Sequence, residues 1–284
     1  MNKKILALYG LKYNPFTPDV PTEALYVCPA LENFFWRIEH TLIPDGGFSL
    51  LAGDPGTGKS AALRLLSERL SHMRDVQVGA LTHSSARLSD FYRELGDIFG
   101  LTLKAHNRWH SFKQLRERWL QHLNTTLLHP VLFIDEAQEM PSGVLNELRL
   151  LTSMKFDSQI LLSVILAGDS RLTDKLRRDD LIPLGSRIRV RINTTYADAD
   201  QLMQVLQHLL EKAGNPGLMT PALKQTLCEH AMGNHRALVT MAAELLSQAA
   251  LKEKSQLDEQ LYLECFAVPA STRKTKKHNV GGLS

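Results

Sequence analysis

Short apolar runs alternate with longer amphipathic segments along the first two thirds of the chain. The apolar runs have the composition of buried parallel strands, and the longer segments place leucines and aromatics three or four residues apart, as helices do. The expected strands are the run that stops at Gly53 and residues 76–81, 130–134, 160–167 and 188–192. The expected helices are 61–70, 88–99 and 112–128, the last with Leu115, Trp119, Leu123 and Leu127 on its buried side. This alternation predicts an α/β fold with three layers and a parallel sheet, whose ligand lies at the carboxyl ends of the strands.

After Ala197 the pattern changes to short amphipathic helices. One helix is expected over 201–212, because Gly214 and Pro216 follow as a stop signal. A second begins at Thr220-Pro221, a capping residue followed by a proline in the first turn, and a third spans 237–251. The sequence therefore predicts a smaller all-α domain behind the α/β core.

The turn after the first strand has the composition of a phosphate-binding loop. Residues 53–60 read GDPGTGKS and match the pattern G-x-x-x-x-G-K-[ST] at every fixed position. Glycines let backbone amides converge on phosphate oxygens, and the helix that follows directs its positive end to the same place. Lys59 can reach the β- and γ-phosphates, and the Ser60 hydroxyl can hold Mg²⁺. The predicted nucleotide-binding residues are Gly53, Asp54, Pro55, Gly56, Thr57, Gly58, Lys59, Ser60 and Ala61.

A second element of the same site is expected at the end of the strand 130–134. This wholly apolar run is followed by Asp135 and Glu136. Asp135 is predicted to hold Mg²⁺ together with Ser60, and Glu136 to activate the water that attacks the γ-phosphate. The two motifs together predict a Mg²⁺-dependent nucleoside triphosphatase.

Charge and cysteine content change this picture only at the C-terminus. The net charge of +3 comes from the segment 271–284, since the remaining chain has 29 of the 33 basic residues against 30 acidic ones. This tail is expected to be disordered and either to dock on a partner or nucleic acid or to have only a solubilising effect. No apolar run reaches the roughly 20 residues of a membrane helix, so no membrane partner is expected. Cys28, Cys228 and Cys265 lack metal-site spacing and are interpreted as buried free thiols of a cytoplasmic protein.

These motifs resemble those of the AAA+ ATPases. The resemblance implies a sensor residue after the next strand, where Asp169 stands; many relatives have Asn, Thr or Gln there, and an ionised Asp cannot donate a hydrogen bond. It also implies an arginine finger, for which Arg187 in LGSRI is the best match and Arg189 and Arg191 are alternatives. In the helical domain, which resembles the AAA+ lid, Arg236 of GNHR corresponds to the arginine that senses the γ-phosphate.

The opening segment is similar to a narrower grouping. YGLKYNPF at 9–16, with ALY at 24–26, resembles the ExeA/GspA-like ATPases, whose grouping includes transposition ATPases of the TnsC, TniB, IstB and MuB type. In that grouping the opening packs beside the adenine, so Tyr13, Pro15 and Phe16 are either adenine neighbours or core residues. The expected divisions are an N-terminal segment on the nucleotide site at 1–46, the AAA+ core at 47–196, the lid at 197–268 and the tail at 269–284.

The absence of a transmembrane helix and a peptidoglycan-binding region favours the transposition branch of this grouping. The resemblance then implies an ATPase that assembles on duplex DNA as a ring or helical filament and hands a target site to a transposase, with ATP and Mg²⁺ as cofactors. Tentative DNA contacts are Ser84 and Arg87 in one loop and Lys104, Arg108 and Lys113 in another. The alternatives are a secretion-type or signalling ATPase without nucleic acid, and a replication initiator or helicase loader.

Overall fold

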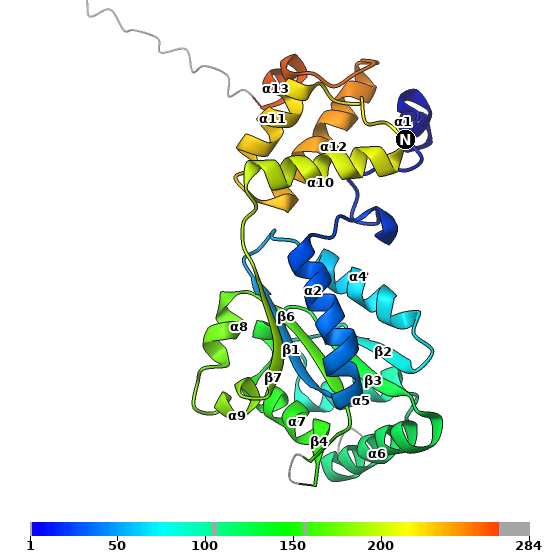
Figure 1. Cartoon of the computed structure of the whole chain (residues 1–284), viewed down its shortest axis with the longest axis vertical. Helices are drawn as coiled ribbons and strands as arrows, with labels where there is room; N and C mark the ends of the chain where they lie inside the picture. Colours follow the sequence, from blue (N-terminus) through cyan, green and yellow to red (C-terminus); the bar gives the residue numbers. More distant parts are fainter. Residues whose placement is uncertain (1, 104–106, 156–157, 267–284) are drawn as a thin grey trace, which may run out of the picture.

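The computed structural model describes residues 2–103, 107–155 and 158–266. Within these residues, five parallel strands form one sheet in the order β2-β3-β6-β1-β7. Figure 1 shows this sheet and its helices as one body, with a separate group of helices stacked beyond the ends of its strands. The strands are β1 (Gly47–Gly53), β2 (Val76–Leu81), β3 (His129–Ile134), β6 (Ser163–Gly168) and β7 (Ile188–Thr194), and a small hairpin is formed by β4 (Ser153–Met154) and β5 (Gln159–Ile160).

Helices cover both faces of the sheet, which confirms the predicted three-layer α/β fold. Alternate residues of one strand belong to opposite apolar cores: Leu132 and Ile134 pack on one face, and Val131 and Phe133 on the other. The helices of this body are α2 (Pro29–Arg37), α3 (Ile43–Asp45), α4 (Lys59–Ser71), α5 (Leu88–Phe99), α6 (Arg108–Gln121), α7 (Ser142–Thr152), α8 (Ser170–Lys175) and α9 (Ile182–Gly185), with the turns η1 (Thr22–Ala24), η2 (Ile38–Leu42), η3 (His122–Thr126) and η4 (Ala137–Glu139).

Two of the expected elements differ from the structure by more than two residues at one end. The helix expected over 112–128 begins at Arg108, is α-helical to Gln121 and continues as the π-helical η3 to Thr126. Leu127, which was expected on its buried side, follows with a left-handed backbone (φ 54°) and is 67% exposed. The strand expected over 160–167 begins only at Ser163, since Ile160 pairs with Ser153 in the β4–β5 hairpin.

The second group of helices, here called the lid, has its own apolar core. It consists of α10 (Ala199–Ala213), α11 (Pro221–His230), α12 (His235–Leu251), α13 (Glu259–Phe266) and the N-terminal α1 (Asn2–Tyr9). Local signals set their starts: Asp198 and Gln201 form a capping box, and the Thr220 hydroxyl accepts from the backbone N–H of Leu223. None of the described helices is long and apolar enough to cross a lipid bilayer.

The position of the N-terminal segment differs from the sequence prediction. The prediction places residues 1–46 on the nucleotide site, but Ile5, Tyr9, Leu11 and Phe16 are buried in the lid core. The amide of Asn215 donates to the Tyr9 carbonyl (2.8 Å), and the Tyr9 hydroxyl donates to the Lys254 carbonyl (2.9 Å). The first residues of the chain are thus part of the lid, whereas the carbonyl of Pro18 accepts from Arg64 of α4 (2.7 Å) and Tyr26 and residues 28–31 line a cavity beside the phosphate loop.

Candidate functional site

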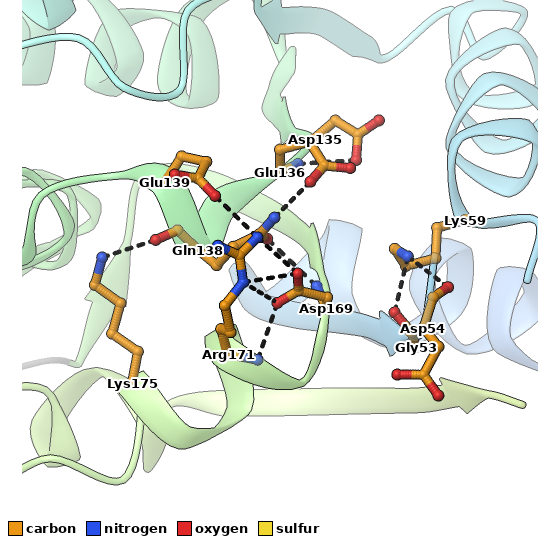
Figure 2. Close-up of polar contacts among 10 residues, drawn as sticks. All are labelled: Gly53, Asp54, Lys59, Asp135, Glu136, Gln138, Glu139, Asp169, Arg171 and Lys175. Atoms are coloured by element: carbon orange, nitrogen blue, oxygen red, sulfur yellow. Dashed lines mark hydrogen bonds and ion pairs between the residues drawn. The ribbon is translucent and has the colours of Figure 1, made fainter. Parts of the chain in front are cut away.

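The sheet register brings the predicted nucleotide residues to one edge. Gly53 ends β1 opposite Thr194 of β7, Ala52 lies beside Gly168 of β6, and Leu166 of β6 lies beside Ile134 of β3. Because the strands are parallel, the segments that follow β1, β3 and β6 emerge at the same edge. Asp135, Glu136 and Asp169 therefore stand beside the loop 53–60, as the sequence predicts (Figure 2).

The loop 53–60 leads directly into α4. Gly56 and Gly58 have positive φ values (84° and 94°), and Lys59 is the first residue of the helix. The Lys59 side chain is only 7% exposed, and its ammonium donates to the carbonyls of Gly53 (2.8 Å) and Asp54 (3.0 Å). Both acceptors are uncharged carbonyl oxygens, so these two contacts leave the positive charge of the ammonium available to an anion.

Ser60 and Asp135 form the link between the two motifs. The Ser60 hydroxyl donates to Asp135 Oδ2 (2.9 Å), although 75 residues separate them in the chain. The other oxygen, Oδ1, accepts from the backbone N–H of Glu136 (2.9 Å). A hydroxyl and a carboxylate are oxygen donors of the kind that Mg²⁺ prefers, so this pair can hold that ion.

Glu136 and Asp169 have different surroundings. The Glu136 carboxylate accepts from the side-chain amide of Gln138, and its backbone is left-handed (φ 50°). The Asp169 carboxylate caps α8 by accepting from the backbone N–H of Arg171 (2.9 Å) and also pairs with the Arg171 guanidinium (2.8 Å). These hydrogen bonds from Arg171 lower the pKa of Asp169 below its usual range, so the carboxylate stays ionised and cannot donate.

The lid touches the phosphate loop directly. The backbone N–H of His235, at the start of α12, donates to the Gly56 carbonyl (3.0 Å), and the Asn234 amide donates to the Pro55 carbonyl (3.4 Å). A Cβ at Gly56 would lie 2.1 Å from Asn234 Oδ1, so only glycine permits this approach. Arg236 follows on the same turn of α12 and is exposed.

A cavity of about 360 Å³ lies between the loop, α2 and the lid. Thr57 and Gly58 contribute to its wall, and Tyr26, residues 28–31, Gln201 and His235 form other parts. Tyr13, Pro15 and Phe16 do not line it: Phe16 is buried in the lid core, and Tyr13 packs against that core. Burial lowers the pKa of the cavity-lining His235, which favours its neutral form.

Arg187 lies near the amino-terminal ends of the parallel strands, whereas the phosphate loop lies at their carboxyl ends. It directly precedes β7, a strand of seven residues that ends at Thr194 beside Gly53. At ~3.3 Å per residue the strand puts Arg187 on the order of 20 Å from its own phosphate loop. Of the two alternatives, Arg189 forms an ion pair with Asp45 (3.3 Å), and the Arg191 guanidinium donates to the Gly185 carbonyl (2.7 Å).

Two of the three DNA contacts expected on the second loop, Arg108 and Lys113, have acidic partners within the protein. The Arg108 guanidinium binds both carboxylate oxygens of Glu147, and its Nε–Oε1 distance is 2.8 Å. Glu147 is 2% exposed and also accepts from the Tyr92 hydroxyl. Lys113 pairs with Glu117 (3.6 Å), and Lys104 lies outside the described residues.

The first loop borders an acidic depression. Ser84 is half-buried, and Arg87 is exposed just before α5. A cavity of about 500 Å³ beside them is lined by Asp90, Glu94 and Asp97 together with Arg93 and His83, and Arg93 forms an ion pair with Asp90 (2.9 Å). Glu94 also accepts from the Thr82 hydroxyl.

The sequence analysis did not name two residues that contact the site. Gln138 follows Glu136 by two residues, and its position in the motif DEAQ (135–138) could have indicated that it lies near the acidic pair. Thr194 was not considered, but its hydroxyl lies 2.7 Å from that of Thr57. A Cβ at Gly53 would lie 2.0 Å from Thr194 Oγ1, so β7 closes against the loop only because that position is glycine.

Comparison with known proteins agrees with this geometry. The family model described as AAA domain matches residues 44–176, from just before β1 to α8. The fold is that of an AAA+ protein. The structure of the Aeropyrum pernix ORC2 protein, solved as ADPNP–ADP complexes, is similar with a TM-score of 0.68 at 14% identity, over 88% of this chain and 70% of that one. The Aeropyrum pernix ORC1 protein in complex with DNA is similar with a TM-score of 0.66 at 21% identity, over 87% of this chain and 67% of that one.

A sequence relative extends the comparison beyond the AAA domain. General secretion pathway protein A from Aeromonas hydrophila is 30% identical over 224 residues, which are 77% of this chain. The chain spans 40% of the length of that relative. The matched length exceeds the AAA domain, so the similarity includes residues of the lid or the N-terminal segment.

The Arg108–Glu147 contact predicts a stability effect. Removal of the guanidinium in Arg108→Ala leaves the buried carboxylate without its charged donor, and we expect the free energy of unfolding to fall by about 1–3 kcal/mol at pH 7. Burial raises the pKa of Glu147, but hydrogen bonds from Arg108 and Tyr92 outweigh this and lower it overall. In Arg108→Ala the effect of burial on Glu147 is no longer offset by the guanidinium, so the difference from the wild type should be complete only above the raised pKa of Glu147 in the variant and should shrink as the pH falls through it.

Urea titrations at several pH values measure this difference. Lys113→Ala is the matched control, because its partner Glu117 is 62% exposed and the pair should contribute less than about 1 kcal/mol. Equal effects of the two variants would contradict the structural role of Arg108.

Proposed function

We propose that this protein is a Mg²⁺-dependent ATPase of the AAA+ type. The observation that carries the proposal is the contact between Ser60 and Asp135 (2.9 Å), which joins a carboxylate from the end of β3 to the hydroxyl of the residue that follows Lys59 in the phosphate loop. The AAA-domain match and the nucleotide complexes of a protein with the same fold support it.

The roles of the site residues follow from their positions. The amides of the loop and Lys59 hold the phosphates, for which Lys59 exchanges its two carbonyl partners for phosphate oxygens. Ser60 and Asp135 hold Mg²⁺, which neutralises charge on the phosphates when bound. Glu136 takes a proton from the attacking water. Arg236, beside the contact between lid and loop, senses the γ-phosphate from the lid.

The cavity between the loop and the lid is proposed to hold the adenosine part of ATP. It adjoins Thr57 and Gly58, and its volume of about 360 Å³ is within the range of small-molecule sites. Since α2 and α10 both contribute to its wall, a bound nucleotide would contact core and lid together.

Arg187 is proposed to act in the site of a neighbouring protomer. Its position at the start of β7 is too far from its own loop, but it suits a finger that crosses an interface and offsets charge on the γ-phosphate. A repeated head-to-tail contact of this kind produces a ring or a helical filament.

The partner is proposed to be duplex DNA, with a transposase or target-selection protein as the recipient of the assembled site. The transposition reading is supported by the resemblance of the opening segment, and DNA binding by the fold shared with an ORC1 protein in complex with DNA. Because Arg108 and Lys113 have acidic partners, Arg87, Lys104 and the basic residues of the tail remain the proposed phosphate contacts. For such a DNA-binding protein, the proposed location is the cytoplasm.

A secretion-type ATPase is the second candidate, and it is equally well supported. The observation that favours it is the 30% identity to general secretion pathway protein A. The initiator fold of the ORC proteins supports a third possibility, a DNA-bound replication factor, which differs from the first in its partner protein.

Lys59→Ala should abolish nucleotide binding. The ammonium is the charged donor of the loop, and its loss removes the charge-assisted hydrogen bonds to the β- and γ-phosphates. Titration with a fluorescent ATP analogue in the presence of Mg²⁺ measures this, with the wild type as reference. Retained affinity would disprove the phosphate-loop assignment.

Glu136→Gln should bind ATP and hydrolyse it at least about 100-fold more slowly, since the general base is lost. Electron microscopy with duplex DNA then separates the candidate functions: we expect ATP-dependent rings or filaments on DNA, which persist longer for this variant than for the wild type. Oligomers that form with ATP but ignore DNA would favour the secretion-type candidate, and rapid release of the variant from DNA would contradict hydrolysis as the disassembly step.

Arg187→Ala should bind ATP with unchanged affinity, fail to assemble with ATP, and lose about 1000-fold in ATPase rate. Light scattering with ATP and with ADP measures the assembly. Arg189→Ala and Arg191→Ala on β7, which begins directly after Arg187, are the matched controls. Loss of assembly in one of them but not in Arg187→Ala would assign the finger role to that residue.

A further inference from the structure

Gln138 is a buried amide that joins the ends of two strands. It lies in η4, directly after the acidic pair that follows β3, and is 7% exposed. Its Nε2 donates to the Glu136 carboxylate, and its Oε1 accepts from the backbone N–H of Asp169 (3.3 Å) at the end of β6. Its own carbonyl accepts from Lys175 of α8 (3.0 Å), so both its side chain and its backbone are fixed (Figure 2).

The backbone around Glu136 is shaped for this contact. Glu136 has φ 50°, a conformation that L-residues rarely adopt, and its carbonyl accepts from the N–H of Glu139 (2.9 Å) to close the turn. This turn brings the side chains of residues 136 and 138 together. A left-handed residue at a candidate catalytic position indicates that the surrounding structure fixes its orientation.

The end of β6 accommodates the amide by having no side chain at Gly168. A Cβ there would lie 2.5 Å from Gln138 Oε1 and 2.8 Å from Leu172 Cδ2. Asp169, the next residue, cannot supply a donor itself, because its carboxylate accepts from the N–H and the guanidinium of Arg171. The side-chain amide found at this place therefore comes from the turn after β3.

We infer that Gln138 is a positioning residue for ATP hydrolysis: its amide orients the Glu136 carboxylate and connects it to the end of β6. The inference rests on the proposed ATPase function. With one oxygen of Glu136 accepting from Gln138, the rotation of the carboxylate is restricted and its other oxygen is left to accept a proton from water. A displacement of about 1 Å in such a group costs about 100-fold in rate, so the effect is on turnover rather than on ATP binding.

Gln138→Leu tests this, because it keeps the approximate volume and removes both hydrogen bonds. We expect kcat for ATP to fall about 10- to 100-fold, with the ATP affinity measured by a fluorescent analogue changed less than about 3-fold. Gln138→Glu keeps an oxygen for the Asp169 N–H but has no donor for Glu136, and should lose a similar factor. Gln225→Leu is the matched control, since it removes a glutamine–glutamate hydrogen bond (2.9 Å) on the exposed face of α11 and should leave kcat unchanged.

A double variant separates positioning from a general structural role. In the Glu136→Gln background, single-turnover hydrolysis should not slow further when Gln138→Leu is added, because Gln138 acts through Glu136. An additive loss, a joint loss of kcat and ATP affinity, or a wild-type rate in Gln138→Glu would overturn the inference while the ATPase function stands. A wild type that binds ATP but does not hydrolyse it would overturn the proposed function and the inference with it.

Discussion

The arrangement of the site depends on glycines in the phosphate loop: two segments approach the loop more closely than a side chain permits, and a third glycine gives the loop a left-handed backbone. Thr194 contacts the loop at Gly53, Asn234 contacts it at Gly56, and the positive φ of Gly58 turns the chain into α4. Glycine at these positions lets β7, the lid and α4 meet at one point. The ammonium of Lys59, the Ser60–Asp135 contact and the cavity between core and lid all follow from that meeting.

The same edge of the sheet joins groups that respond to one another. Asp135 bonds to Ser60 of α4, Glu136 to Gln138, and Gln138 to the end of β6, while Asp169 and Arg171 connect that end to Glu139. The chain of contacts therefore runs from Ser60, at the start of α4, across the ends of β3 and β6. Side-chain networks of this kind can contribute more to the structure than the sum of their separate hydrogen bonds.

Charge is distributed differently from what the sequence indicates. Arginine and lysine on α6 look available for nucleic acid in the sequence, but Arg108 neutralises the buried Glu147, and Lys113 pairs with Glu117 on the next turn. The exposed arginines on β7 alternate with the buried Ile188 and Val190 and so lie on one face. The basic side chains that remain for an external partner are fewer than the composition implies.

The sequence by itself determined the fold class, the five strands of the central sheet, six of the helices and the phosphate loop, because these are local properties. An apolar run, a helical period, a cap such as Asp198 or Thr220, and a glycine pattern each act within a few residues. The strand 76–81 and the helix 88–99 were predicted with the bounds that the structure has. The carboxylates after β3 were also predictable, since parallel strands end at a common edge.

Only the tertiary structure decided which distant residues meet. The burial of Phe16 in the lid, the contact of Asn234 with Gly56, the pairing of Arg108 with Glu147 and the position of Gln138 between two strands depend on packing between segments far apart in the chain. A polar residue in a sequence shows what it can donate or accept, but its partner is set by strand order and helix docking. For this reason the sequence identified the chemistry of the site, and the fold decided which side chains hold that chemistry in place.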